Sequence, residues 1–392
     1  MALTAGIVVI GGGVTGVSIA FHLARRGVRD VVVVEKQFVA AAATGKSSAC
    51  VRQHYSTPET CRMVLASLRF FERFEDMTGG RTASFVRTGY LLGVDDRLRR
   101  QMEASVALQQ SVGINSQLVS PKEIQELEPR MRTDDLVAGC YEPESGYADP
   151  SQTAHGFAGA ARDLGVKIME QTEVLGVLKR GDRIAGLDTS RGAIEAPIVV
   201  NAAGTWGERV GRMVGLEIPI TVCRHKINFV AWPQEARRPH PLVYDFVTNI
   251  YTRPETGGLI LVGSLDSEEL NDRADPDGYQ EGVSFDETAD ALGRVGHRFP
   301  VLERGAVAKG YAGCFDVTPD WHPILDKVGP EGFYVAVGFS GHGFKLSPAV
   351  GAMMAELITE GSRPGADVSA FRLSRFAEGK PIRGTYGDWL MC

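Results

Sequence analysis

Near its N-terminus the chain runs from a short apolar segment directly into a glycine cluster, and this pairing limits the possible folds more than any other feature. Residues 6–10 resemble a buried strand of a parallel sheet, and GGGVTG at 11–16 follows at once. A helix then ends near Gly27, and the strand VVVVE places Glu35 about twenty residues beyond the glycines. Strand, GxGxxG, helix, strand and acid in this order predict a Rossmann-type unit that binds a dinucleotide.

Each part of this unit has a physical role. The glycines permit a tight turn and let the backbone approach a pyrophosphate, whose charge is stabilised by the N-terminus of the helix. The carboxylate of Glu35 can accept hydrogen bonds from ribose hydroxyls. The residues assigned to the cofactor from this unit are Gly11, Gly13, Val14, Thr15, Gly16, Glu35 and Lys36. The motif predicts a dinucleotide but does not distinguish NAD from FAD.

Composition narrows the class of protein. The 392 residues are enough for two or three domains with a real core. A net charge of −6 gives no electrostatic case for nucleic-acid binding. No apolar run reaches the roughly 18 residues of a membrane span, and MALTAGIVVIGGG lacks the basic start of a signal peptide. Six cysteines without a CxxC pair argue against a disulfide framework or a metal site and suit the cytoplasm.

Two further segments resemble continuations of the cofactor site. The stretch 43–48 is small and rich in hydroxyls, so it allows a second backbone contact with a phosphate or a flavin ring. A returning Rossmann unit follows, with a helix after 146–150, strands near 165–168 and 173–174, and a strand at 198–200 that ends in the small residues of NAAGTW. From these segments we assign Thr44, Ser47, Ser48, Val174, Ala203, Gly204 and Trp206 to the cofactor.

The stretch GFSGHGFKLSP at 338–348 predicts a second approach to the cofactor. It leaves the carboxyl end of a strand at 332–337, where open α/β sheets bind ligands. Ser347 is expected to cap a helix whose first residue is Pro348 and which ends near Gly361. The positive end of that helix favours a reduced flavin, which is negatively charged near N1 and O2, so the cofactor is expected to be FAD. The residues assigned from this stretch are Gly341, His342, Gly343, Phe344 and Lys345.

The chain as a whole resembles the D-amino-acid-oxidase-like superfamily of FAD enzymes, in its sarcosine oxidase and dimethylglycine dehydrogenase branch. The resemblance covers nearly the whole chain through GGGVTG, ATGKSSACVRQ, GYADP, VVNAAGTWG, IYTRPETGG, GCFDVTPDWHPILD and GFSGHGFKLSP. It implies an α/β plus α+β fold. A Rossmann-type FAD domain is built from the discontinuous segments 1–88, 148–220 and 305–392, and a substrate domain of 89–147 and 221–304 surrounds a mainly antiparallel sheet.

The resemblance also implies a reaction and its residues. Family members pass a hydride equivalent from the carbon beside the substrate nitrogen to flavin N5, and the imine then hydrolyses. In sarcosine oxidases an Arg and a Lys hold the substrate carboxylate, and Arg52 and Lys345 match them here. Tyr251 matches a tyrosine of the substrate pocket. His54 is a candidate for polarising the amine or the flavin, as are His225 and His342. Arg253 is a second anion-binding group or a cap of the sheet edge.

Three departures from the family pattern refine these expectations. Gly313 stands where some sarcosine oxidases carry a flavin-linked cysteine, and Cys314 comes one residue later, so we expect both to contact a non-covalent FAD. GLILVG at 258–263 lacks the lysine that promotes reaction with oxygen, which hints at a dehydrogenase. Phe315 replaces the arginine of a G-x-R stretch that binds primary D-amino acids, so an N-substituted amino acid ranks first.

The leading hypothesis is therefore an FAD enzyme that oxidises a secondary or tertiary amino acid, N-alkylated or cyclic. Oxygen or an electron-carrier protein or quinone is the acceptor. The alternatives are a D-amino-acid or 2-hydroxy-acid dehydrogenase on the same fold, and the flavin-bearing beta subunit of a hetero-oligomer with partner subunits. An NAD-binding protein without flavin is the simplest alternative. The exact substrate and the oligomeric state stay open at this point.

Overall fold

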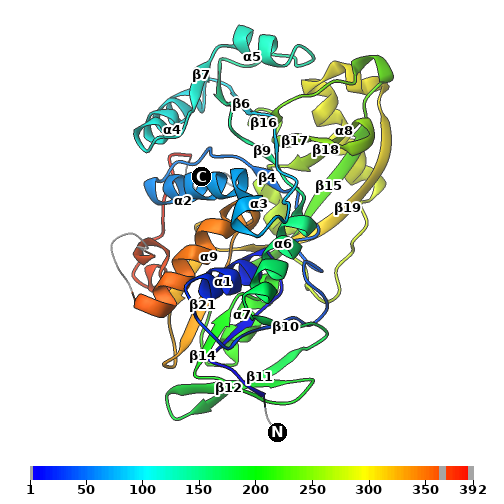
Figure 1. Cartoon of the computed structure of the whole chain (residues 1–392). Coiled ribbons are helices and arrows are strands. Elements are labelled where there is room, and N and C mark those ends of the chain that lie inside the picture. Colours follow the sequence, from blue (N-terminus) through cyan, green and yellow to red (C-terminus); the bar gives the residue numbers. More distant parts are fainter. Residues whose placement is uncertain (1–2, 362–367, 387–392) are drawn as a thin grey trace.

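The computed structural model describes residues 3–361 and 368–386, and two of its four sheets organise the chain (Figure 1). One is a six-stranded sheet covered by helices, and the other is an eight-stranded sheet in the upper part of Figure 1. The predicted fold class is thus confirmed, with an α/β part and a mainly antiparallel part. Within the described residues, no helix combines the length and apolar character that a bilayer crossing requires.

The six-stranded sheet is assembled from segments far apart in the sequence. It is parallel except where β20 meets β21, and its four central strands are short and almost entirely buried, as expected for a sheet covered on both faces. In sheet order the strands are β10 (Lys167–Met169), β3 (Val31–Val34), β2 (Ile7–Ile10), β14 (Ile198–Asn201), β21 (Phe333–Val337) and β20 (Ile324–Lys327). The predicted returning unit is therefore present, with β14 beside β2.

Helices and a small sheet enclose this parallel sheet. The apolar cluster on one face contains side chains of α1 (Val14–Arg25), α2 (Pro58–Glu72), α6 (Pro150–Asp163) and α9 (Gly343–Glu360). Helices α1 and α9 pack closely because Gly351 has no side chain; a Cβ there would lie 2.2 Å from Ser18 Oγ. The second cluster includes α7 (Gly207–Arg212) and the sheet β1 (Leu3–Thr4), β13 (Ile194–Glu195), β12 (Arg183–Thr189), β11 (Val174–Arg180).

Helix α9 begins earlier than the sequence indicates. We expected Ser347 to cap it and Pro348 to start it, but its first residue is Gly343, and Pro348 lies inside the helix. A proline in a helix leaves the carbonyl four residues earlier without its N–H donor. Here the hydroxyl of Ser347 donates to the carbonyl of Phe344 at 2.9 Å, which replaces the missing bond. The predicted end is confirmed, since Gly361 has φ 74° at the C-cap.

The eight-stranded sheet is antiparallel except where β16 meets β6. In sheet order its strands are β19 (Ala306–Val317), β15 (Thr221–Ala231), β18 (Leu259–Ser264), β17 (Ile250–Glu255), β16 (Leu242–Asp245), β6 (Tyr90–Val94), β8 (Ala138–Glu142) and β7 (Gln117–Val119). Alternation places aliphatic side chains such as Val243 on the face covered by α8 (Phe285–Arg298) and aromatic ones such as Tyr244 on the other. The aromatic face is the one that contributes to the site.

The remaining elements connect these parts. They are α3 (Phe74–Met77), α4 (Arg99–Ser111), α5 (Pro121–Leu127) and the three-stranded sheet β4 (Cys50–Val51), β9 (Gly146–Tyr147), β5 (Val86–Arg87). The domain limits stay a prediction. One strand of the segment 305–392, β19, pairs along its length with β15 and so belongs to the eight-stranded sheet, although we assigned that segment to the FAD domain.

Candidate active site

A cavity of about 300 Å³ lies at the carboxyl ends of the parallel strands and extends to the aromatic face of the large sheet. Its wall includes the glycine turn at one end and Tyr251 at the other. A cavity at this edge of a parallel sheet is the usual ligand site of open α/β folds, and its volume is within the range of small-molecule sites.

The glycine turn has the geometry that a pyrophosphate requires. A Cβ at Gly11 would lie 2.4 Å from the carbonyl of Ala202, and one at Gly16 would lie 2.0 Å from the carbonyl of Gly11. The first turn of α1 faces the cavity through Gly13. The N–H of Val14 donates to Thr44 Oγ1 at 3.0 Å, and Gly13 itself provides no side-chain cap to the helix. Its N–H groups and dipole therefore attract an anion. Glu35 accepts from Gly12 N at 2.7 Å and lines the cavity, where ribose hydroxyls fit.

A second helix begins at the same cavity. Gly341, Gly343 and Phe344 contribute to the wall, and α9 starts at Gly343 without a side-chain cap. Two helices whose own N-cap residues make no side-chain cap bond, and which start more than 300 residues apart in the chain, thus open onto one cavity. A ligand with negative charge at two separate places, such as FAD with its pyrophosphate and reduced ring, fits this arrangement. The residues present therefore fit FAD.

A ladder of rings lies on the aromatic face of the large sheet. Tyr90 lies 5.0 Å from Tyr244, and Tyr244 stacks on Tyr251 at 5.2 Å. Tyr251 stacks on His225 at 5.8 Å, and His225 stacks on Phe315 at 4.1 Å. The last three rings line the cavity. Strand register creates the ladder, because Tyr244 and Tyr251 are direct partners across β16 and β17.

A chain of hydrogen bonds runs outward from the phenol of Tyr251. His225 Nε2 lies 2.8 Å from Tyr251 Oη, and Nδ1 lies 2.7 Å from Glu269 Oε2. The ionised carboxylate of Glu269 only accepts, so Nδ1 carries the proton and Nε2 accepts from the phenol. The phenol therefore donates its proton to the imidazole, which leaves the lone pairs of the Tyr251 oxygen available to accept a further hydrogen bond.

Two buried basic side chains, Arg52 and Lys345, lie close to the row of stacked rings. Arg52 is 1% exposed and stacks on Tyr55 and Tyr244, with its guanidinium carbon 4.5 and 5.4 Å from the ring centroids. Lys345 is 6% exposed, and no acceptor in the described part of the chain bonds its ammonium group. Burial lowers the pKa of Lys345 well below its ordinary value, and the charge of Arg52 lowers it further. The two cations therefore lie close enough to repel each other.

Arg253 has a structural role. Its guanidinium donates to the carbonyl of Ser48 at 2.6 Å, donates to the carbonyl of Pro254 at 2.7 Å, and pairs with Glu255 at 2.9 Å. Because β17 lies between β18 and β16 inside the sheet, these partners do not make Arg253 a cap of the sheet edge, the second of the two alternatives raised for this residue.

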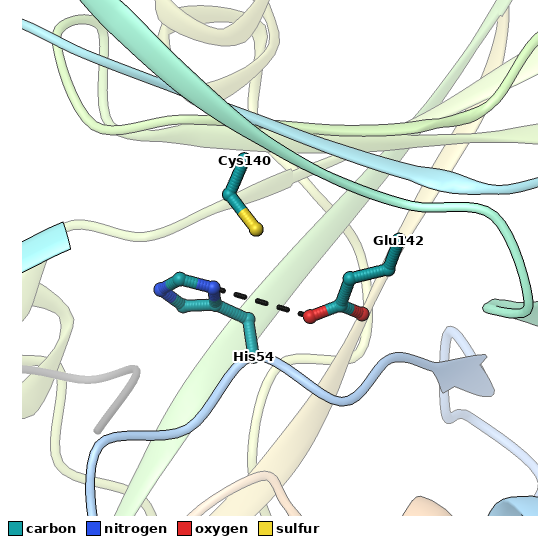
Figure 2. Close-up of side chains that lie close together, drawn as sticks. All are labelled: His54, Cys140 and Glu142. Carbon is teal, nitrogen blue, oxygen red and sulfur yellow. Dashed lines mark ion pairs between the residues drawn. The ribbon is translucent and has the colours of Figure 1, made fainter. Parts of the chain in front are cut away.

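Next to Arg52, three potential metal-binding side chains lie together on the far side from the cavity. His54, Cys140 and Glu142 are fully buried, and their ligand atoms all lie within 4.8 Å of one another (Figure 2). His54 Nδ1 and Glu142 Oε1 are 3.9 Å apart. Burial, and then the charge of Arg52, lower the pKa of His54 to about 3. The imidazole is therefore neutral at physiological pH.

The ring of His54 already has a partner at each nitrogen. Gln109 Nε2 lies 3.2 Å from Nδ1, and the phenol of Tyr386 lies 2.7 Å from Nε2. The amide orientation of Gln109 is fixed, because its Nε2 also donates to the carbonyl of Tyr55 and its Oε1 accepts from Ser116 Oγ. Nδ1 therefore accepts and Nε2 donates. The lone pair that a metal would need is in use, so the geometry favours a hydrogen-bonded imidazole over a metal ligand.

Replacing Glu142 by glutamine is expected to change how stability depends on pH. Burial raises the pKa of Glu142 to about 7, above the ordinary value of 4.5. Folding therefore takes up a proton, and this stabilisation is complete below the unfolded-state pKa and lost as pH rises through 7. The unfolding free energy of each protein is measured by chemical denaturation. The difference between wild type and Glu142→Gln should fall by about 3 kcal/mol between pH 4.5 and 8. Parallel profiles for the two proteins would contradict this assignment.

Most residues predicted to bind the cofactor lie in the cavity wall. They are Gly11, Gly13, Val14, Thr15, Glu35, Lys36, Thr44, Ser47, Ser48, Val174, Ala203, Gly204, Trp206, Gly313, Cys314, Gly341, Gly343 and Phe344. Gly16, His342 and Lys345 are not in that wall, and His342 Nδ1 lies 2.9 Å from the phenol of Tyr55. Of the predicted substrate residues, Tyr251 lines the cavity, whereas Arg52, His54 and Lys345 are not in its wall.

Five charged wall residues were not among those predicted, namely Lys46, Glu173, Arg209, Asp277 and Asp316. Lys46 lies against Gly313 and bonds the phenol of Tyr279 at 2.6 Å; it stands within the quoted ATGKSSACVRQ stretch, so its neighbours could have indicated it. Asp277 accepts from Lys36 at 2.6 Å and from the indole of Trp206 at 2.9 Å. Asp277 lies in a loop without a motif, so the sequence contains no signal for it.

Comparison with known proteins agrees with this geometry. The family profile described as "FAD dependent oxidoreductase" matches residues 6–357. A mitochondrial sarcosine dehydrogenase of Mus musculus is 29% identical over 384 residues, which cover 95% of this chain and 41% of that protein. The chain therefore spans less than half the length of that relative. A sarcosine oxidase subunit beta of Rhodobacter capsulatus is 25% identical over 96% of this chain and 89% of that one.

A solved structure has a closely similar fold. The crystal structure of L-proline dehydrogenase from P. horikoshii superposes with a TM-score of 0.89, at 30% sequence identity, over 97% of this chain and 100% of that chain. The similarity covers both the six-stranded and the eight-stranded sheet, since it includes almost every residue.

Proposed function

This chain belongs to the family of FAD-dependent oxidoreductases, and we propose that it oxidises the C–N bond of a secondary or tertiary amino acid whose carboxylate binds Arg52 and Lys345. The cofactor is FAD, so the alternative of an NAD-binding protein without flavin is set aside. When bound, FAD accepts the hydride equivalent from the carbon beside the substrate nitrogen. The residues of the chain bind the substrate, orient it and handle its protons.

The observation that carries the proposal is the buried cation pair. An isolated ammonium is costly to bury, yet Lys345 is buried without an acceptor in the described part of the chain and close to a second cation. A carboxylate supplied by the substrate compensates both charges at once. The guanidinium of Arg52 is held flat by the rings of Tyr55 and Tyr244, and a planar fork of donors suits a carboxylate better than a point charge does.

The chain Tyr251–His225–Glu269 supports an amine substrate. An amino acid in water carries an ammonium group, whereas hydride loss from the adjacent carbon needs a free amine. Tyr251 lies at the cavity wall with its oxygen bonded to His225, so the phenol is placed to accept that proton through its hydrogen-bond partner. Named relatives act on sarcosine and L-proline, an N-methyl and a cyclic amino acid, which supports the N-substituted class over a 2-hydroxy acid or a primary D-amino acid.

We further propose that FAD is held without a covalent bond to Cys314. Burial raises the pKa of the Cys314 thiol to about 11, so the thiol is protonated and weakly nucleophilic at physiological pH. Acid precipitation of the purified protein should leave the yellow colour in the supernatant.

The relatives also support proposals about partners. A sarcosine oxidase subunit beta matches along most of its length, so an assembly with partner subunits is a second candidate arrangement. The proposed electron acceptor is oxygen, an electron-carrier protein or a quinone. Within the described residues the cysteines are buried free thiols, which supports a reducing compartment such as the cytoplasm.

The test is anaerobic addition of sarcosine, dimethylglycine and L-proline, each separately, to the purified yellow protein. We expect one of them to bleach the visible flavin absorption, because reduction removes that band. Bleaching by D-alanine or a 2-hydroxy acid alone would contradict the substrate class. A protein that bleaches only after a partner chain is added would identify the subunit arrangement.

A further inference from the structure

The three consecutive residues 52–54 are held by hydrogen-bond partners that lie outside the cofactor cavity. Arg52 Nη1 donates to the backbone carbonyl of His54, which ties the guanidinium to the position of that residue. The N–H of Gln53 donates to Glu142 Oε2 at 2.8 Å. The ring of His54 lies between Gln109 and a phenol. The orientation of Arg52 therefore depends on how firmly His54 is held.

The phenol that holds His54 comes from the opposite end of the chain. Tyr386 is 332 residues away in sequence, is 7% exposed, and accepts from His54 Nε2 at 2.7 Å. Its ring packs edge to face on Phe246 at 5.4 Å, next to the aromatic ladder. From the sequence we expected His54 to be a candidate for polarising the substrate amine. In the structure its ring is neutral and both ring nitrogens are already hydrogen-bonded, so it cannot also take that role.

The path of the C-terminal segment to this point is anchored by buried bonds. Asp320 accepts from Arg375 at 2.7 and 2.9 Å and from the N–H of Ile382 at 2.9 Å. The N–H of Thr385 donates to Ser56 Oγ at 2.9 Å. Asp320 belongs to the stretch GCFDVTPDWHPILD, whose first residues line the cavity but whose residues from Val317 onward do not. Its role in this structure is to fix the segment that delivers Tyr386.

We propose that Tyr386 is a positioning residue for substrate binding: through His54 it orients Arg52 toward the substrate carboxylate. The inference rests on the proposed function, since it assumes that Arg52 binds that carboxylate. Loss of the phenol oxygen leaves the Nε2–H of His54 without its acceptor in a buried site, which frees the ring and shifts the carbonyl that Arg52 bonds. The segment around Tyr386 thereby influences which carboxylates bind, although it does not line the cavity.

The experiment is a double-mutant cycle on the FAD-loaded protein. The probe is pyrrole-2-carboxylate, a planar amino-acid analogue, and its Kd is measured from the shift it causes in the flavin spectrum. Tyr386→Phe keeps the ring and removes only the hydroxyl, and we expect it to raise Kd about tenfold. In an Arg52→Met background the same change should alter Kd by less than about twofold. At saturating substrate, the rate of flavin reduction should stay within about twofold of wild type.

The possible outcomes separate the two proposals. If Tyr386→Phe has no effect, or the same effect with and without Arg52, the positioning role is wrong while the proposed function stands. If Arg52→Met itself leaves Kd unchanged, the carboxylate clamp is wrong. Tyr334→Phe, which removes a tyrosine hydroxyl from the interior strand β21, is the matched control and should leave Kd unchanged. Should Tyr386→Phe fail to yield holoenzyme, Ser56→Ala loosens the same segment at Thr385 and gives the same test.

Discussion

Replacing Arg52 by methionine is expected to raise the substrate concentration for half-maximal flavin reduction by about 30- to 800-fold while FAD stays bound. The guanidinium is 1% exposed, and the loss of a desolvated, charge-assisted pair costs about 2–4 kcal/mol. Methionine keeps an unbranched apolar stem and removes the charge together with the guanidinium that stacks on Tyr55 and Tyr244. Stopped-flow reduction at increasing substrate concentration measures the effect.

A matched control exists outside the strands of the large sheet, in the connection between α5 and β8. The side chain of Arg130 is 5% exposed and pairs with Glu128 at 2.6 Å, far from the cavity wall. Arg130→Met should lower stability, because it leaves a buried carboxylate without its partner, but should leave the substrate requirement unchanged. Equal shifts in both variants would mean that the effect of Arg52 is general destabilisation and not the loss of a clamp.

Replacing Gly13 by valine is expected to give a folded protein that purifies without colour. Gly13 has φ −68°, a value open to any residue, so the backbone tolerates the change. A Cβ there would lie 3.2 Å from Thr44 Oγ1, and the branched side chain would occupy space at the start of α1 where the pyrophosphate binds. We expect FAD affinity to fall by at least about 100-fold, measured as flavin released per protein and by titration of the apoprotein.

A change of glycine to valine at an exposed position of another helix supplies the control. Gly293 lies in α8, and nothing stands within 4 Å of a Cβ placed on it. Gly293→Val should keep a full complement of FAD and a nearly unchanged thermal midpoint. A yellow Gly13→Val protein would show that the pyrophosphate is held at another place.

Much of the cofactor site could be predicted from the sequence, because it depends on local backbone chemistry. The turn 11–16 needs glycine for a close approach of the chain to itself, and short apolar runs beside it predict buried parallel strands. The start of α9 was predicted wrongly because Ser347-Pro348 is a typical local start signal, whereas the side chain of Ser347 instead repairs the bond that the proline removes.

The substrate side was less predictable because it depends on contacts between distant segments. The ladder through Tyr244 and Tyr251 exists only in the observed register of two strands, and Gly263 makes room for the ring of Tyr251. The partner of His54 comes from 332 residues away. Nothing in the spacing of either residue indicates such a contact, and hydrophobic periodicity does not report side-chain pairing across a fold.

The order of strands in the parallel sheet has a consequence for biosynthesis. Strand β2 leaves the ribosome first, but its neighbour β14 follows almost 200 residues later, and β21 and the start of α9 come later still. A nascent chain that has exposed the glycine turn therefore lacks most of the cavity wall. The chain must be synthesised at least as far as Gly343 before the whole cavity wall can form around flavin, and premature termination anywhere before Gly343 yields a product without the second helix N-terminus.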